Sequence, residues 1–197
     1  MCKPDCNAIR SPLPGPTPRL RLRLWTPADQ AWFRQLNADP RVMRYFPHVL
    51  NPAASDAFLD RIKAHHQTHG FSLWAVELRA SARLIGFTGL LIPQCPLPFS
   101  PCVEIAWRLA HEYWGQGYAS EAARAVLRLG FEPLQLAEIV SCTALGNQRS
   151  QALMQRLGLQ RSASEDFDHP ALPSGHPLSR HVLYRLSRVA WQGRDQK

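Results

Sequence analysis

The chain has 197 residues, of which 45 % are apolar and 19 % are charged. This composition excludes a globally disordered protein, and the length fits one domain with a full hydrophobic core. Lysine and arginine number 23 against 15 acidic residues, which gives a formal net charge of +8. A positive charge of this size suits an anionic ligand such as a phosphate, a nucleotide or RNA, but it selects none of them.

Targeting signals and metal-binding patterns are not visible in the sequence. No apolar run approaches the length of a membrane span, and the first residues lack the apolar segment of a signal peptide. The five cysteines are an odd number, and their spacing fits no zinc site. We therefore expect a cytoplasmic protein with reduced thiols and no bound metal, in which Cys102 and Cys142 are small core residues.

The domain organisation predicted from the sequence is simple. Residues 1–18 contain five prolines and are expected to form a loose tail. A single domain is expected over residues 19–190, followed by a short tail over residues 191–197. We find no internal repeat and no further domain boundary.

The first half of the domain is expected to contain two helices and four strands. Alternating leucine and arginine predict a strand over residues 20–24. A helix is expected over residues 27–38, because a threonine–proline pair is typical of a helix start, and a second over residues 52–69, where a glycine would end it. An antiparallel meander is expected to follow, with strands over residues 71–78, 84–92 and 102–109.

The second half is expected to alternate helices and strands. Residues 117–131 are the clearest helix, because alanine, valine and leucine fall on one face and charged residues on the other. A strand over 138–143, a helix over 148–157 and a last strand over 181–186 complete the order. The pattern predicts an α/β fold with a mixed, mostly antiparallel central sheet flanked by helices.

A glycine-containing turn, Trp-Gly-Gln-Gly-Tyr-Ala over residues 114–119, joins the last strand of the meander to the following helix. Small residues let the backbone approach a ligand, and the free N–H groups of a helix start attract an anion. The turn therefore predicts a pyrophosphate site. A tight turn that holds no ligand is the alternative.

The wider sequence around this turn is more specific. The runs over residues 103–109 and 111–122 resemble the acetyl-CoA-binding segment of the GNAT superfamily of N-acetyltransferases. The similarity is greatest to the RimJ/RimL-type branch, which includes acetylases of ribosomal-protein N-termini. Residues 39–46 upstream and residues 147–159 downstream resemble the same branch, and the resemblance covers roughly residues 19–189.

The resemblance implies a GNAT-like fold whose sheet splays at the cofactor strand and leaves a notch for acetyl-CoA. The family turn reads Arg/Gln-x-x-Gly-x-Gly/Ala; Gly117 and Ala119 match it, and Trp114 departs from it at the first position. The backbone of residues 115–119 would hold the pyrophosphate. The residues implied to bind the cofactor are Trp107, Leu109, Trp114, Gly115, Gln116, Gly117, Tyr118, Ala119, Ser120 and Asn147.

The reaction that the resemblance implies is direct transfer of the acetyl group to a primary amine, either a protein N-terminal α-amine or a small molecule. Such a reaction needs a neutral amine, a stabilised oxyanion and a protonated leaving thiolate. Glu104, in mid-strand beside the notch, is the candidate base, Ser150 the candidate proton donor, and Asn147 the candidate bridge to the amine. Each of these residues also has a structural alternative. Glu104 could pair with an arginine, Asn147 could be the N-cap of the helix that follows it, and Ser150 could have a structural role alone.

Residues 165–181 hold three acids and three histidines. We interpret this loop as an edge of the acceptor pocket, where Glu165, Asp166 and Asp168 would attract a cationic amine. A solvated acidic loop is the alternative, and the spacing of the histidines does not indicate a metal site.

Three other functions are weighed against an acetyl-CoA-dependent N-acetyltransferase. The turn could be a dinucleotide fingerprint with Ser120 in place of the third glycine and Glu138 as the distant acid, although Glu138 should then end a strand rather than begin one. The chain could also be a non-catalytic acyl-CoA sensor or scaffold, or an RNA- or ribosome-associated module. The expected partners are acetyl-CoA and an amine acceptor, without a membrane, and with nucleic acid only through a ribosomal substrate. We expect a monomer or a homodimer.

Overall fold

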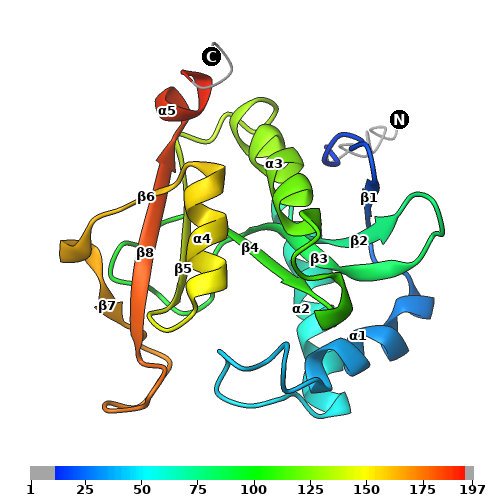
Figure 1. Cartoon of the computed structure of the whole chain (residues 1–197), viewed down its shortest axis with the longest axis horizontal. Helices are drawn as coiled ribbons and strands as arrows, with labels where there is room; N and C mark the ends of the chain where they lie inside the picture. The colour runs from blue at the N-terminus through cyan, green and yellow to red at the C-terminus, as the bar shows by residue number, and fades with distance from the viewer. Residues whose placement is uncertain (1–11, 194–197) are drawn as a thin grey trace, which may run out of the picture.

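A computed structural model describes residues 12–193 of the chain (Figure 1). Its centre is an eight-stranded sheet in the order β1-β2-β3-β4-β5-β8-β6, with β7 paired to β8. In the described part, all strand pairs are antiparallel except β4–β5. The strands are β1 (Leu20–Arg23), β2 (Leu73–Leu78), β3 (Leu84–Leu91), β4 (Glu104–Leu109), β5 (Glu138–Ala144), β6 (Gln160–Arg161), β7 (Phe167–Asp168) and β8 (Arg180–Ser187).

Helices cover both faces of the sheet. Figure 1 shows α3 and α4 crossing its front, with α2 behind it. The helices are α1 (Gln30–Ala38), α2 (Pro52–His69), α3 (Tyr118–Phe131), α4 (Gln148–Leu157) and α5 (Arg188–Gln192). The mixed α/β fold and the mostly antiparallel sheet predicted from the sequence are thus confirmed. Each predicted strand and helix is present, and the first turn of the predicted helix over 27–38 is a 3-10 helix.

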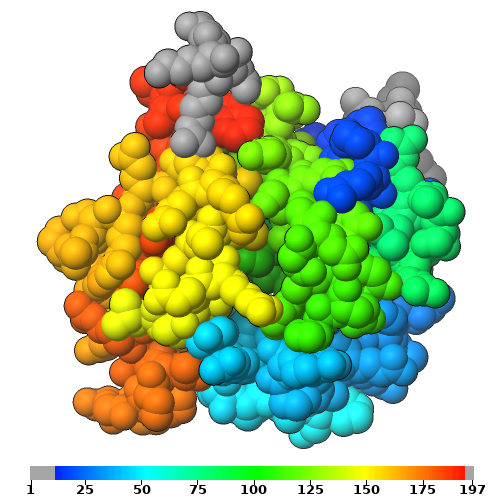
Figure 2. Space-filling model, in the orientation of Figure 1, coloured from blue at the N-terminus to red at the C-terminus, as the bar shows by residue number. Residues whose placement is uncertain are grey.

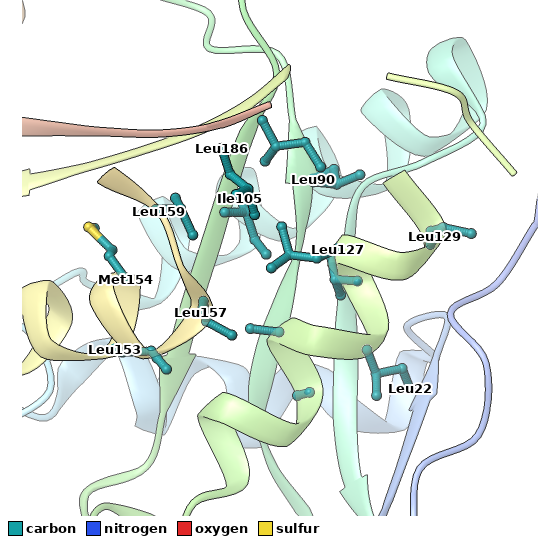
Figure 3. Packing of buried hydrophobic residues seen from close by; sticks show 14 of the residues in the cluster. Leu22, Leu90, Ile105, Leu127, Leu129, Leu153, Met154, Leu157, Leu159 and Leu186 are labelled. Atoms are coloured by element: carbon teal, nitrogen blue, oxygen red, sulfur yellow. The ribbon is translucent and has the colours of Figure 1, made fainter. Parts of the chain in front are cut away.

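The larger apolar core lies between the sheet and α3 and α4. One face of α3 places Ala122, Ala123 and Leu127 against strand residues such as Leu90 and Ile105 (Figure 3). Gly130 near the end of α3 brings the helix close to β5, since a Cβ there would lie 2.5 Å from Cδ1 of Ile139. This packing fixes α3 against the middle of the sheet, so the glycine turn at its N-terminus has a defined position.

A second core covers the opposite face of the sheet. Phe33 and Leu36 of α1 and Leu59 of α2 pack there against Leu73 and Phe87 of the sheet. Alternate residues of β4 therefore face different layers: Ile105 points toward α3, whereas Ala106 points toward α1 and α2. The two layers are the two sides from which ligands can reach β4.

The sheet opens between β4 and β5. Only Glu104 and Val140 are in register across this parallel pair, where the Val140 N–H donates to the Val103 carbonyl at 2.9 Å. The Ser141 hydroxyl adds a bond of 3.0 Å to the Ile105 carbonyl. Residues 106–109 continue without a β5 partner, so the strands part toward their carboxyl ends. This split is the splay that the family resemblance implies.

Buried residues lie just outside both predicted domain edges. Thr17 is buried; its hydroxyl donates to Glu121 of α3 at 2.6 Å, and its carbonyl accepts from Arg79 at 2.9 Å. Trp191 is also buried and stacks on Phe131 at 5.6 Å between ring centroids. The predicted boundaries at residues 18/19 and 190/191 therefore leave packed residues outside the domain, and the rest of the two predicted tails, residues 1–11 and 194–197, lies outside the described residues.

Removal of residues 1–18 is expected to lower the thermal midpoint relative to a chain that begins at residue 12. The truncation removes the hydrogen bond from Thr17 to the Glu121 carboxylate, and a bond of this kind contributes about 1–3 kcal/mol. For a domain of this size the loss corresponds to about 2–12 °C. Differential scanning calorimetry of the two truncated chains tests this, and equal midpoints would show that Thr17 contributes nothing.

Membrane and metal features were sought in the described residues. No helix within residues 12–193 is both long and apolar enough to cross a membrane. Over the same range, no group of three or more histidine, cysteine or acidic side chains is arranged to hold a metal ion.

Candidate active site

The glycine turn has the backbone geometry of an anion site. Gly115 and Gly117 adopt φ of +76° and +81°, in the left-handed region that favours glycine, and Gly117 caps the N-terminus of α3. The bond from the Glu121 N–H to the Gly117 carbonyl opens the helix, so the N–H groups of residues 118–120 precede its hydrogen-bonding ladder. A Cβ added at Gly115 would meet nothing within 4 Å, so the turn is open to a ligand.

Arg19, which precedes β1, holds this turn from outside. Its Nη1 donates to the Gln116 carbonyl at 3.0 Å, its Nε donates to Glu121 at 2.6 Å, and its guanidinium lies 4.5 Å from the centre of the Tyr118 ring. The Gln116 side chain turns back to donate to the Glu112 carbonyl at 2.7 Å. The turn is therefore fixed before any ligand arrives.

A cavity of about 1470 Å³ begins beside the turn and passes through the split between β4 and β5. Space of this size exceeds an ordinary small-molecule pocket of about 300–1,000 Å³, so it can take a large ligand together with a second one. Figure 2 shows a recess where the yellow surface of α4, the green surface of α3 and the blue segment before α2 meet.

Nine of the ten residues predicted to bind the cofactor line this cavity. The exception is Gln116. Its side chain donates to the Glu112 carbonyl, so Gln116 can offer a ligand only its backbone. The nine are Trp107, Leu109, Trp114, Gly115, Gly117, Tyr118, Ala119, Ser120 and Asn147.

Trp107 presents unpaired backbone to the split. Backbone polar groups alternate sides along a strand, and the Ile105 carbonyl already points toward β5, where it accepts from Ser141. The N–H and carbonyl of Trp107 therefore point the same way, beyond the place where β5 diverges. The Leu109 carbonyl is taken by the Trp114 indole N–H at 2.8 Å, so an extended ligand arm in the split would pair with Trp107 rather than Leu109.

Glu104 lies on the opposite face of β4 from α3, at the base of the cavity. The Cys142 N–H and thiol both donate to its Oε1, at 3.4 and 3.3 Å, and no arginine or lysine pairs with it among residues 12–193. Desolvation of the enclosed carboxyl raises the pKa of Glu104 above its ordinary value despite the two bonds from Cys142. The alternative of an arginine-paired structural carboxylate is therefore wrong, and the geometry suits a weak base facing the cavity.

Cys102 and Cys142 are half-buried and pack against a small apolar cluster, so the prediction that they are small core residues is confirmed only in part. Burial, together with the charge of Glu104, raises the pKa of the Cys142 thiol well above its ordinary value. Cys142 thus stays protonated and acts as a hydrogen-bond donor. The buried members of the cluster are Leu97, Val140, Phe167 and Leu183.

Asn147 and Ser150 lie at the N-terminus of α4, and both line the cavity. The Asn147 Oδ1 accepts from the Ser150 N–H at 3.3 Å, and its Nδ2 donates to the Thr143 hydroxyl at 2.9 Å. Asn147 is therefore the N-cap of α4, as its structural alternative predicted, although it also faces the cavity. The catalytic roles of Asn147 and Ser150 remain predictions.

Replacement of Asn147 by alanine is expected to destabilise the protein by about 0.5–2 kcal/mol, the usual effect of losing an N-cap. Asn147→Ser is the matched control, because serine keeps a capping oxygen but loses the amide bond to Thr143. The free energy of unfolding from urea titration separates the two variants. Equal losses in both would place the contribution in the bond to Thr143 instead of the cap.

The loop over residues 165–181 borders the cavity, as predicted, but not through its acids. Arginines of the loop and of the chain next to it occupy the three carboxylates: Glu165 pairs with Arg185 at 2.8 Å, Asp168 pairs with Arg180 at 3.6 Å, and Asp166 pairs with Arg161. None of the three acids lines the cavity. The prediction that they attract a cationic amine is therefore wrong in this structure.

Two histidines from the same region line the cavity instead. His169 and His181 both line the cavity, and their ring centroids lie 4.9 Å apart with the rings tilted by 51°. Burial lowers the pKa of both, and the neighbouring His181 lowers that of His169 further. Both rings are therefore neutral at pH 7, and they make this wall uncharged.

The dinucleotide interpretation of the turn is wrong on two counts. The strands before the turn, β3 and β4, are antiparallel, whereas a dinucleotide fold opens with a parallel unit. Glu138 begins β5 and bonds to Arg185 at 2.7 Å, away from the turn.

Comparisons with known proteins agree with this geometry. The profile of the acetyltransferase (GNAT) domain family matches residues 19–160. An uncharacterised N-acetyltransferase of Bacillus subtilis, YnaD, is 28 % identical over 176 residues, which cover 89 % of this chain and 97 % of that protein. A crystal structure of an acetyltransferase from Agrobacterium tumefaciens superposes with a TM-score of 0.70 at 27 % identity, covering 87 % of this chain and 92 % of the other.

One comparison concerns a structure that contains ligands. Spermidine N-acetyltransferase from Vibrio cholerae, in complex with CoA and spermine, superposes with a TM-score of 0.69 over 88 % of this chain and 98 % of the other. Its identity of 19 % supports a shared fold alone.

Proposed function

Because this chain belongs to the GNAT acetyltransferase family and is an acyltransferase, we propose that it transfers the acetyl group of acetyl-CoA directly to a primary amine. One observation carries the proposal: a single cavity connects the glycine turn, the split beside Trp107 and the Glu104 carboxylate. The motifs at residues 39–46 and 147–159 favour the RimJ/RimL-type branch. The free cysteines at positions 95, 102 and 142 and the use of acetyl-CoA fit the cytoplasm.

The residues on the α3 side fit the phosphates and the extended arm of acetyl-CoA. The N–H groups at the start of α3 would bind the pyrophosphate, with Ser120 adding a hydroxyl. Arg149, whose guanidinium lies 5.0 Å from the Trp114 ring centre, and Arg156 line the same part of the cavity and add positive charge. Trp107 would pair with the pantetheine arm. Bound there, acetyl-CoA supplies the acetyl group as a thioester.

The residues on the other face of β4 fit the amine. At pH 7 a lysine side chain needs about 4.6 kcal/mol to become neutral, and an N-terminal α-amine needs only about 1–1.4 kcal/mol. A carboxylate of raised pKa such as Glu104 is adequate to take one proton from an α-amine, directly or through water. The hydroxyl of Ser150, beside the split, would donate to the leaving thiolate.

A thermal-shift experiment tests the cofactor site first. Acetyl-CoA at 100 times its Kd should add about 2.7 kcal/mol to the free energy of unfolding, which for this domain is roughly 5–11 °C. NAD at the same concentration is the control and should give no shift. A screen of amines with detection of the released CoA thiol then tests the transfer. A shift with acetyl-CoA but no amine-dependent thiol release would instead support a non-catalytic acyl-CoA-binding protein.

A further inference from the structure

Arg108 of β4 is enclosed in the cavity without an anionic partner. It lies on the same face of the strand as Glu104 and lines the cavity wall toward α1 and α2. Its Nη1 donates to Oδ1 of Asn37, but its Nε has neither a hydrogen-bond partner nor contact with solvent. No carboxylate within residues 12–193 forms an ion pair with it. Desolvation lowers the pKa of Arg108 to about 9.

Aromatic rings form the rest of its surroundings. The guanidinium carbon lies 4.1 Å from the ring centre of Phe46, 5.2 Å from that of Phe87 and 5.6 Å from that of Phe58. Cation–π contacts offset part of the cost of removing the charge from water, but they leave the N–H donors at the guanidinium edge unsatisfied. An enclosed cation normally needs a paired anion as well.

The position of the guanidinium is set by a short chain of polar side chains. Asn37 and Ser55 are fully buried, and the Asn37 Nδ2 donates to the Ser55 hydroxyl at 2.8 Å. This bond turns the Asn37 oxygen toward Arg108, so α1 and α2 together hold the cation in place. The arrangement fixes the guanidinium in the cavity wall and leaves the Nε donor unsatisfied.

The charges on the cavity wall agree with an anionic ligand. Glu104 is the only carboxylate among the described residues that line the cavity, whereas several arginines line it. Of these, Arg41 is paired with Asp39 at 2.7 Å, and Arg44 lies two residues from Phe46, whose ring contacts Arg108. A polyamine would therefore bring two or more positive charges to a compartment with one acid. An amine that also carries a carboxylate would match both Glu104 and Arg108.

We propose that the amine acceptor carries a carboxylate, as an amino acid does, and that Arg108 binds this group while the amine faces Glu104. The inference rests on the proposed acetyltransferase function and names its substrate class. A planar guanidinium suits the bidentate recognition of a carboxylate. The Cα atoms of Glu104 and Arg108 are separated by about 13 Å along the strand, and both residues line the cavity, so acceptors of several lengths must be compared.

The test uses amines in matched pairs that differ by the carboxylate. The pairs are 4-aminobutyrate and butylamine, phenylalanine and phenethylamine, and lysine and 1,5-diaminopentane, and the readout is kcat/KM from release of the CoA thiol. We expect at least one carboxylate-bearing amine to be preferred about tenfold or more over its partner, since a site that loses a paired charge discriminates strongly. Spermidine should be a poor acceptor.

Variants then assign the preference to this residue. Arg108→Met keeps the length of the side chain and removes the charge, and it should bring the paired ratio close to one while the Kd of acetyl-CoA stays within about twofold. Arg61→Met is the matched control, because Arg61 is an exposed arginine of α2 beside the Phe58 ring that does not line the cavity, and it should retain the preference. If Arg108→Met does not fold, the comparison of pairs on the wild-type protein still decides the matter.

The results separate this inference from the proposed function. Equal or better use of the amines that lack a carboxylate in every pair would overturn the inference and leave the acetyltransferase proposal standing. Retention of the preference in a folded Arg108→Met protein would also overturn it. Failure of all amines, with or without binding of acetyl-CoA, would reject both proposals.

Discussion

Replacement of Gly117 by glutamate is expected to weaken acetyl-CoA binding by about 100-fold or more while the protein remains folded. Gly117 is the N-cap of α3, where a pyrophosphate would lie against the first N–H groups. A carboxylate placed there repels the phosphates and occupies the positive end of the helix, and like charges brought together cost several kcal/mol. The site itself is at the surface, so the core under α3 is untouched.

The backbone at this position requires a control. Gly117 has φ of +81°, and an added Cβ would lie 3.3 Å from Nη2 of Arg19, so any side chain adds strain of about 1–2 kcal/mol. Gly117→Ala carries the same strain without the charge. Isothermal titration of both variants with acetyl-CoA, alongside their thermal midpoints, separates the two effects. If glutamate binds acetyl-CoA as well as alanine does, the pyrophosphate does not lie at this turn.

Replacement of Glu104 by glutamine is expected to lower kcat by about 100-fold or more and to leave the Kd of acetyl-CoA unchanged. The carboxylate must be ionised to accept a proton, so the wild-type rate should fall as pH drops through the raised pKa of Glu104. The glutamine variant should lack this acid limb. Glu112→Gln, at an exposed carboxylate beside the turn, is the control and should behave as wild type. A Glu104→Gln rate within about twofold of wild type across pH 6–9 would make Glu104 structural.

The effect of Glu104→Gln on thermal stability should depend on pH. Folding raises the pKa of the Glu104 carboxyl, so its protonated form stabilises the folded protein. This contribution is complete below the pKa of the unfolded state, and it is lost as pH rises through the pKa of the folded state. Above the folded-state pKa, the wild-type protein holds an enclosed negative charge, which destabilises it. The Glu104→Gln variant holds no such charge. Glu104→Gln should therefore have the higher thermal midpoint at pH 8, and the difference should shrink toward pH 4. A lower midpoint for the variant at pH 8 would contradict the direction of the pKa shift.

Helices and strands with a strong periodicity were predictable from the sequence, because residues close together in the chain determine where they begin, which face is apolar and where they end. The apolar face of α3, the glycine that ends α2 and the alternating strand of residues 20–23 all carry their own signals. The glycine turn was predictable for the same reason, since two glycines at a helix start restrict the backbone geometry. Glu104 was identified from its predicted place in mid-strand beside the split implied by the family resemblance, although β4 begins at Glu104 rather than at residue 102.

Other parts of the site depend on contacts between distant segments. Arg19 and Glu121, which fix the glycine turn, are 102 residues apart in the chain, and Asn37 and Arg108 are 71 apart. No periodicity reports such pairs. The acids of residues 165–168 looked available for a ligand because sequence spacing does not show which arginines pair with them. The two-residue strands β6 and β7 are too short to show any alternation.

Transfer of a labelled acetyl group tests the account most directly. Wild-type protein is incubated with acetyl-CoA carrying 13C in the acetyl group and with the amines described above. The products are identified and quantified by mass spectrometry. If the acetyl group passes directly to the amine, the labelled N-acetyl amine should equal the released CoA thiol in amount. Gly117→Glu should give no product. Label that remains in acetyl-CoA, or that appears only as acetate, would contradict amine acetylation by this protein.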